Sequence, residues 1–230
     1  VEVHMARVQI FLSTVSDEFR SYRDKLRRDL TQPNVSIAVQ EDFIVTGTET
    51  LDMLDDYIRQ CDAVIHLIGD MTGALAQAPS LEVIRARYLN LGDLLPPLAP
   101  FLQAGAPPLS YTQWEAWLAL YHGKPLFIAV PEDEAPRDKS FKPIPEQRAA
   151  QQEHVNRLAQ VERYPGIRFA NSDRLAVDVL RSKLREVLDR AGPIVKPANL
   201  PFLSIGALFK GRETELDHLA RSLGPVPDSH

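Results

Sequence analysis

Short apolar segments recur along most of this chain, and a helical pattern separates nearly every one from the next. The segments cover residues 8–13, 35–39, 63–68, 126–130 and 167–169. Helices are predicted over residues 16–30, 49–60, 146–162 and 173–190, and another from about residue 110. Short apolar runs are typical of strands buried on both faces. The alternation predicts an α/β fold, an open parallel sheet of about five strands with helices on both faces and a flavodoxin-like winding through right-handed crossovers.

The region 72–109 interrupts this alternation and is rich in Pro, Ala and Leu. One helix is predicted there, around 81–91, and the five prolines between 96 and 108 predict irregular structure after it. The domain is expected to span residues 5–190, with the four residues before Met5 as an addition and 191–208 as a linker. Residues 209–230 carry a helical pattern too short to fold alone, and we expect them to begin a further domain.

Composition narrows the classes of function. The formal net charge of −5 gives no electrostatic support for nucleic-acid binding. Cys61 is the only cysteine, which excludes an intramolecular disulfide and a cysteine-based zinc site. We also see no membrane-span pattern and no signal peptide, and therefore expect a cytoplasmic protein.

Most standard site motifs are absent, including the dinucleotide fingerprint, the P-loop, His-Glu-x-x-His and Gly-x-Ser-x-Gly. The histidines are scattered, and His66 lies inside an apolar strand, which favours a core histidine over a ligand. No metal site is predicted.

Ligands of open α/β sheets bind beyond the carboxyl ends of the strands. Four such places follow the predicted strands: Ser13-Thr14, Glu41-Asp42, Gly69-Asp70 and Pro131-Glu132. Ser13 and Ser16 could hold a phosphate near a helix N-terminus, or Ser16 could simply open the helix as its N-cap. Asp42 could bind a ligand or be only a turn residue.

The helix that begins near Ser110 carries one acidic residue, Glu115, among apolar ones. Trp114, Trp117, Leu118 and Tyr121 recur at helical spacing, so their face is expected to be core. Glu115 is placed in the first turn, where the helix dipole favours a carboxylate. The alternative is that Glu115 projects into a pocket and acts on a ligand.

Several of these residues together resemble a family. The opening Phe11-Leu12-Ser13-Thr14, the Ile-Gly that ends the third strand and Ser-Tyr-Thr-x-x-Glu at 110–115 resemble a TIR-like domain of the bacterial branch, over about residues 7–190. The Phe-x-Gly-Arg-Glu at 209–213 resembles the entry of a STAND or NB-ARC type ATPase.

The resemblance implies an NAD+ glycohydrolase whose essential glutamate is Glu115, eight residues before Gly123-Lys124. It further implies that Tyr111 lines the pocket and that residues 42–50 form a mobile loop over it. Ser13, Asp42, Gly69, Tyr111 and Trp114 are the expected contacts of the nucleotide. Trp114 could stack on a flat ring, although plain core packing is favoured for it. NAD+ would be a substrate, and no cofactor is expected.

Three functions follow. The first is an NAD+-consuming effector of bacterial immunity, active when an attached STAND ATPase oligomerises. The second is a non-enzymatic TIR-like adaptor that acts by self-association. The third is a deoxyribosyltransferase-like nucleoside hydrolase that uses the same pocket glutamate. Neither nucleic acid nor a membrane is expected as a partner.

Overall fold

The computed structural model describes residues 8–39 and 50–192 of the chain. Its strands are β1 (Val8–Ser13), β2 (Val35–Val39), β3 (Ala63–Leu67), β4 (Leu126–Pro131) and β5 (Ile167–Phe169). All neighbouring strands pair in parallel, in the order β2-β1-β3-β4-β5. This is the flavodoxin-like order, so the predicted fold class is confirmed.

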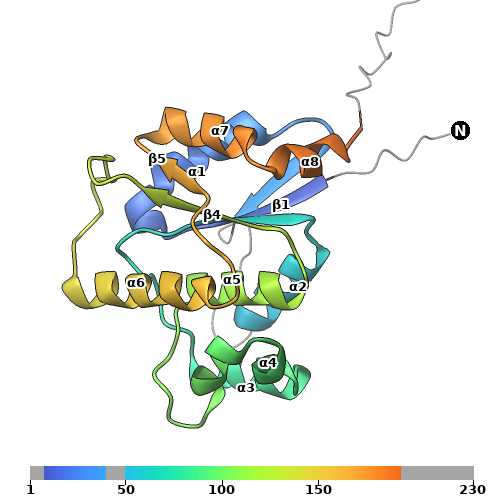
Figure 1. Ribbon diagram of the computed structural model, residues 1–230, viewed down its shortest axis with the longest axis vertical. Helices are drawn as coiled ribbons and strands as arrows, with labels where there is room; N and C mark the ends of the chain where they lie inside the picture. Colours follow the sequence, from blue (N-terminus) through green and yellow to red (C-terminus); the bar gives the residue numbers. More distant parts are fainter. Residues whose placement is uncertain (1–7, 40–49, 193–230) are drawn as a thin grey trace, which may run out of the picture. The chain divides into compact units, whose positions relative to one another are not determined.

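Helices cover both faces of the sheet (Figure 1). One face carries α1 (Ser16–Leu30), α7 (Ser172–Arg181) and α8 (Leu184–Asp189), and the other carries α2 (Thr50–Gln60), α5 (Tyr111–Tyr121) and α6 (Pro145–Ala159). Side chains of β1 alternate between the two layers: Val8, Ile10 and Leu12 join the core with α1 and α7, and Phe11 joins the core with α2 and α5. The period of a strand thus feeds two separate cores.

The region after β3 is more ordered than its prolines predict. It holds α3 (Ala78–Arg87), α4 (Leu91–Leu94) and a 3₁₀ helix, η2 (Pro96–Leu102), packed beyond α2, α5 and α6 (Figure 1). The prediction of irregular structure after residue 95 was therefore wrong for residues 96–102, whereas residues 103–109 are irregular as predicted. Pro96 and Pro97 open η2, where a missing N–H costs nothing because no partner exists for it in the first turn.

The predicted extent of α1 is confirmed, but its N-cap and the course of the last predicted helix differ from the prediction. Ser16 is the first residue of α1 and caps nothing, because Val15 occupies the N-cap position and the Ser16 hydroxyl accepts from Arg23 Nη1 at 2.8 Å. The last predicted helix is divided at Ser182, whose hydroxyl donates to the Val179 carbonyl and accepts from the Leu184 N–H. Such local bonds compete with the helical ladder and end α7.

The helices of residues 8–39 and 50–192 are all too short or too polar to cross a lipid bilayer.

Candidate functional site

A small cavity lies at the carboxyl edge of the sheet, where β1 and β3 are neighbours and the direction of winding reverses. It has a volume of about 200 Å³ and is lined by the β1–α1 connection, by the segment after β3 and by the first turn of α5: Thr14, Val15, Ser16, Asp17, Gly73, Ala74, Tyr111 and Thr112. Ligands of doubly wound sheets bind at such switch points. The cavity is therefore the first candidate for a binding site.

The first turn of α5 is fixed firmly against this cavity. Ser110 and Gln113 form a capping box, in which each side chain accepts from the other residue's backbone N–H at 3.2 Å. Tyr111 is buried, and its hydroxyl accepts from the Gln77 N–H at 3.3 Å. Tyr111 thus lines the cavity, on a helix end that holds its ring in one place.

Glu115 is 1% exposed and lies one turn further along α5 than predicted. With Ser110 as the N-cap, the first turn holds no acidic residue, so the helix-dipole explanation for this carboxylate loses most of its force. Glu115 follows Tyr111 by four residues, and side chains at that spacing lie one above the other. Glu115 therefore lies one turn behind Tyr111, but it is not among the residues that line the cavity.

Ser13 and two histidines form a buried chain beside this edge. Ser13 Oγ lies 2.7 Å from His66 Nδ1, and His66 Nε2 lies 3.2 Å from Nε2 of His154 on α6. Burial lowers the pKa of His66 to about 3, and burial together with His66 and Arg157 lowers that of His154. Both rings are therefore neutral at physiological pH. His66 is a core histidine as predicted, and Ser13 is bonded to it.

Gly69 sits against the buried carboxylate of Glu18. That carboxylate accepts from the N–H groups of Asp70 and Met71 at 3.0 and 2.8 Å, and from Arg137 Nε at 2.7 Å. A Cβ on Gly69 would lie 2.2 Å from Glu18 Oε1. Glu18 thus occupies the backbone donors after β3 and excludes a side chain at residue 69.

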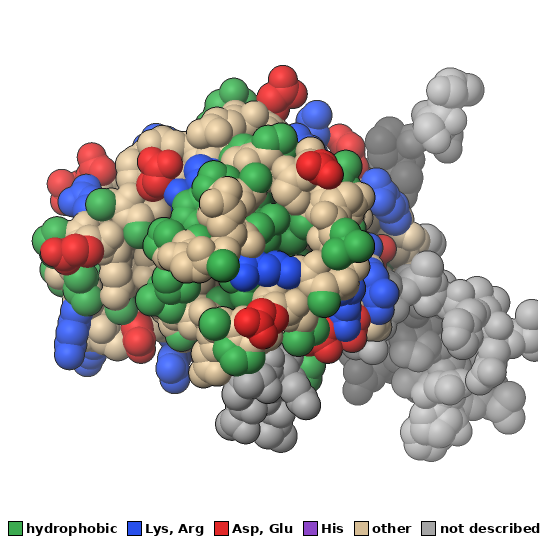
Figure 2. Space-filling view, turned by 90° about the horizontal axis from the view of Figure 1, so that it is seen from below, with side chains coloured by type: hydrophobic (Ala, Val, Ile, Leu, Met, Phe, Trp, Pro, Cys, Tyr) green, Lys and Arg blue, Asp and Glu red, His purple; other side chains and the backbone are tan. Residues whose placement is uncertain are grey.

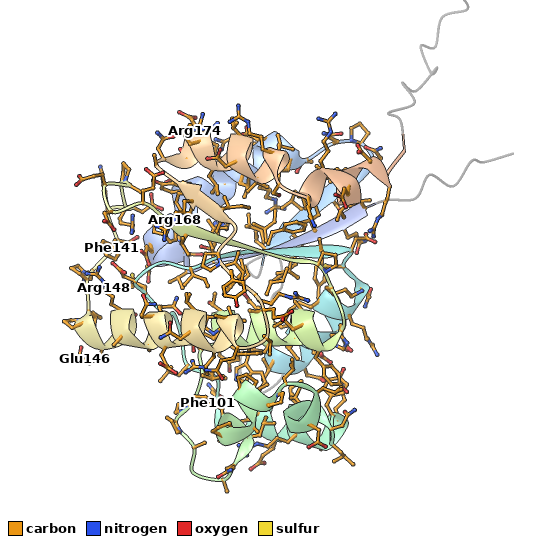
Figure 3. The ribbon with its side chains drawn as sticks, viewed as in Figure 1. Phe101, Phe141, Glu146, Arg148, Arg168 and Arg174 are labelled. Carbon is orange, nitrogen blue, oxygen red and sulfur yellow. The ribbon has the colours of Figure 1, made fainter. Side chains whose placement is uncertain are left out.

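A second, larger hollow joins two of the predicted strand ends. Its volume is about 450 Å³, and it is lined by Gly69-Asp70 after β3 and by Pro131-Glu132 at the end of β4. Arg148 on α6 and Arg168 on β5 also line it, and both lie at this end of the sheet (Figure 3). Its charges are mixed, and Arg148 lies 3.5 Å from Asp70, so it is a polar surface with no fixed preference for anions.

The remaining predicted contacts lie elsewhere. Trp114 is 1% exposed and belongs to the core with Trp117, which is the packing role that its spacing favoured. Asp42, like most of the predicted loop 42–50, lies outside the described residues. Within the described part of the chain, no group of three His, Cys, Asp or Glu residues could hold a metal ion.

One cluster was missed by sequence reasoning. The fully buried carboxylate of Asp55 on α2 contacts His122 Nε2 at 2.6 Å, Tyr88 Oη at 2.6 Å and Arg87 Nη1 at 2.7 Å. Burial alone would raise the pKa of Asp55, but the bonds from His122, Tyr88 and Arg87 outweigh it and lower the pKa below 3.8. These residues are more than thirty positions from Asp55, so no local pattern connects them. We name Asp55, Arg87, Tyr88 and His122 the Asp55 cluster.

Comparison with solved structures gives weak likenesses. "2-desoxiribosyltransferase from Leishmania mexicana" is 18% identical, with 56% of this chain and 67% of that chain covered and a TM-score of 0.34. "Crystal structure of a probable GTP-binding protein engB" is 12% identical, with 80% and 97% covered and a TM-score of 0.37. Scores this low carry no argument about activity. No curated protein matches the chain.

A family model described as "Domain of unknown function (DUF4062)" matches residues 9–183. The match begins at the second residue of β1 and ends just before α8, so it includes the sheet except Val8 and every residue that lines the switch-point cavity. Since it covers well over half of the 230 residues, the chain belongs to the DUF4062 family.

Proposed function

We propose that this domain hydrolyses the N-glycosidic bond of NAD+ at the switch-point cavity, with Glu115 as the catalytic carboxylate. The observation that carries the proposal is the position of Glu115: it is 1% exposed on α5 and lies one helical turn from Tyr111, which lines the cavity, although Glu115 itself does not line it. The TIR-like resemblance of residues 110–115 supports the same assignment.

The chemistry needs only one carboxylate. Nicotinamide is cationic in NAD+ and leaves as a neutral ring, so no acid has to protonate it, unlike the leaving oxygen of a glycoside. The bond from ribose C1′ to the nicotinamide nitrogen breaks with its electron pair on the nitrogen. Water then adds to C1′ and gives up a proton, so the products are nicotinamide and ADP-ribose.

Glu115 would stabilise the positive charge that develops on the ribose. A carboxylate with little exposure to water acts on such a charge through a low effective dielectric, where the attraction is stronger than in solution. Tyr111 would contact a flat ring of the nucleotide at the mouth of the cavity. The described walls enclose about 200 Å³, less than the roughly 300 Å³ at which typical ligand pockets begin, so they would receive one end of the dinucleotide.

The test is nicotinamide release from NAD+ by concentrated protein, for wild type, Glu115→Gln and Glu115→Ala. We expect the variants to lose about 10²- to 10³-fold in rate, as when one electrostatic contact is removed from an active site. Glu82→Gln, an exposed carboxylate on α3, is the matched control and should retain the wild-type rate. Release by Glu115→Gln at the wild-type rate would exclude the proposal.

A second candidate is the non-enzymatic adaptor, which the burial of Glu115 favours because a carboxylate can also serve packing and hydrogen bonding. It predicts concentration-dependent self-association with no turnover of any nucleotide. A panel of deoxynucleosides in the same assay distinguishes the NAD+ hydrolase and the adaptor from a deoxyribosyltransferase-like hydrolase. That hydrolase would cleave the deoxynucleosides and leave NAD+ intact. An attached STAND ATPase as the trigger of assembly remains part of the first proposal.

A further inference from the structure

A third cavity lies between α6 and the inserted helices, apart from the strand ends. Its volume is about 510 Å³, and it is lined by Thr72, Gly73, Leu75, Phe101, Pro108, Leu109, Gln113, Glu146, Gln147, Ala150, Glu153 and Arg157. Figure 3 places Phe101 on the insertion beneath α6 and Glu146 at the start of α6. Seen from that side, hydrophobic side chains are interspersed with polar surface and with charged side chains of both signs (Figure 2).

The polar groups of its walls are largely bonded to each other. Gln147 Oε1 accepts from the Thr72 N–H at 3.0 Å, and Gln113 Nε2 donates to Gln151 Oε1 at 3.0 Å. Arg85 Nη2 donates to the Gln103 carbonyl at 2.8 Å and holds the segment that carries Phe101. These bonds tie α5, α6 and the insertion together, so the cavity has fixed walls.

Arg157 is the exception. It is 7% exposed, its guanidinium lies 4.6 Å from the centre of the Phe101 ring, and its Nε has no hydrogen-bond partner among the described residues. The nearest carboxylate, Glu153, is 3.5 Å from Nη1 and more than half exposed. Nε is itself sealed from solvent, so a ligand oxygen in the cavity would accept from the Nη groups of the same guanidinium.

We propose that this cavity binds a flat aromatic molecule that carries one carboxylate. The ring would lie among Leu75, Phe101 and Leu109, and the carboxylate would accept from Arg157. Charge-assisted bonds of this kind are about twice as strong as neutral ones. Glu146 and Glu153 stand at the same cavity and disfavour molecules with several negative charges. The volume lies within the range of pockets for small molecules. This site is independent of the activity proposed for Glu115.

Calorimetric titration with 2-naphthoate, and with the neutral 2-naphthalenemethanol, tests the assignment. We expect one saturable site, with naphthoate bound at least about tenfold more tightly, the ratio that one hydrogen bond to a charged group supplies. Arg157→Gln should remove that preference. Ala150→Trp, which adds bulk at an exposed wall position, should abolish binding of both molecules.

Arg148→Gln is the matched control, because Arg148 is an exposed arginine of the same helix that does not line this cavity. It should bind both molecules as wild type does. Three results would overturn the assignment: equal binding of the two molecules by wild type, an unchanged preference in Arg157→Gln, or wild-type binding by Ala150→Trp. Failure to bind at millimolar ligand would also overturn it.

Discussion

Two buried polar clusters flank α5, and they use opposite electrostatics. The Asp55 cluster reaches His122 just beyond the end of α5 and keeps a carboxylate charged, because three donors together outweigh the cost of burial. The chain of Ser13, His66 and His154 keeps two imidazoles neutral, because burial disfavours a charged ring at both histidines and His66 and Arg157 act in the same direction on His154. The pKa values of Asp55 and of the two histidines are all lowered. For the carboxylate this favours the charged form, and for the imidazoles it favours the neutral form.

The difference separates structural groups from candidate functional ones. Asp55 on α2 is fully committed to partners from the end of α3 and the end of α5, and its role is to fasten the inserted helices to the domain. The histidine chain ends at Ser13, beside the switch-point cavity, and His154 Nδ1 has no partner among the described residues. The charged Asp55 cluster at one end of α5 thus supports the fold. The neutral chain of Ser13, His66 and His154 lies near the switch-point cavity.

The largest expected effect is on the Asp55 cluster. Asp55→Ala should lower the free energy of unfolding by about 3 kcal/mol or more, because it strands buried donors of His122 and Tyr88 and removes one partner of Arg87. Urea denaturation measures the change. Asp56→Ala is the control: Asp56 is adjacent but 45% exposed, and its loss should cost about 1 kcal/mol or less. Equal costs for both would remove the structural role assigned to Asp55.

The histidine chain should make the domain sensitive to mild acid. The pKa of His66 is about 6.5 when unfolded and about 3 when folded, so its stabilising contribution is complete above pH 6.5 and declines as pH falls. Roughly 2 kcal/mol should disappear between pH 7.5 and pH 5 from this residue, with His154 acting in the same direction.

Thermal unfolding measured across that interval provides the check, and His66→Asn should flatten the dependence on pH. Asp55 itself does not interfere, because a carboxylate with a pKa lowered from 3.8 loses its contribution only as pH falls below about 4. A wild-type protein equally stable at pH 7.5 and pH 5 would contradict a neutral buried pair.

A substitution at Gly69 tests the role of Glu18, the other buried carboxylate near the cavities. Gly69→Ala should cost about 1–3 kcal/mol, since its Cβ would overlap Glu18, which cannot move without releasing Arg137 and two backbone N–H groups. Gly166→Ala meets nothing within 4 Å and should change stability by no more than about 0.5 kcal/mol. Chemical denaturation of the two variants side by side decides whether Glu18 holds this segment.

The smallest effect is expected at the start of α5. Ser110→Ala should cost about 1 kcal/mol through loss of the capping box. If Tyr111 and Glu115 depend on that turn for their position, nicotinamide release should also fall, by more than the loss of folded protein explains. Unchanged stability in Ser110→Ala would show that packing alone orients the helix.

The sequence by itself determined the elements of the sheet. Strand β5 was predicted residue for residue, and β1 and β2 likewise, because apolar runs and helical periods are local properties of the chain. Tyr111 lines the strand-edge cavity, but only the TIR-like resemblance pointed to it. Local reasoning misassigned the N-cap of α1 and missed the 3₁₀ helix after Leu95, since a cap or a 3₁₀ turn is chosen among conformations that differ by about 1 kcal/mol.

Only the tertiary structure decided what the polar residues do. Ser13 and His66 are 53 positions apart, and Asp55 and His122 are 67 apart, yet each pair shares a buried hydrogen bond. Arg157 carries no sign in the sequence that it is buried against Phe101. Burial and partners set the charge and the hydrogen bonding of such groups, and both depend on segments that meet only after the sheet has formed.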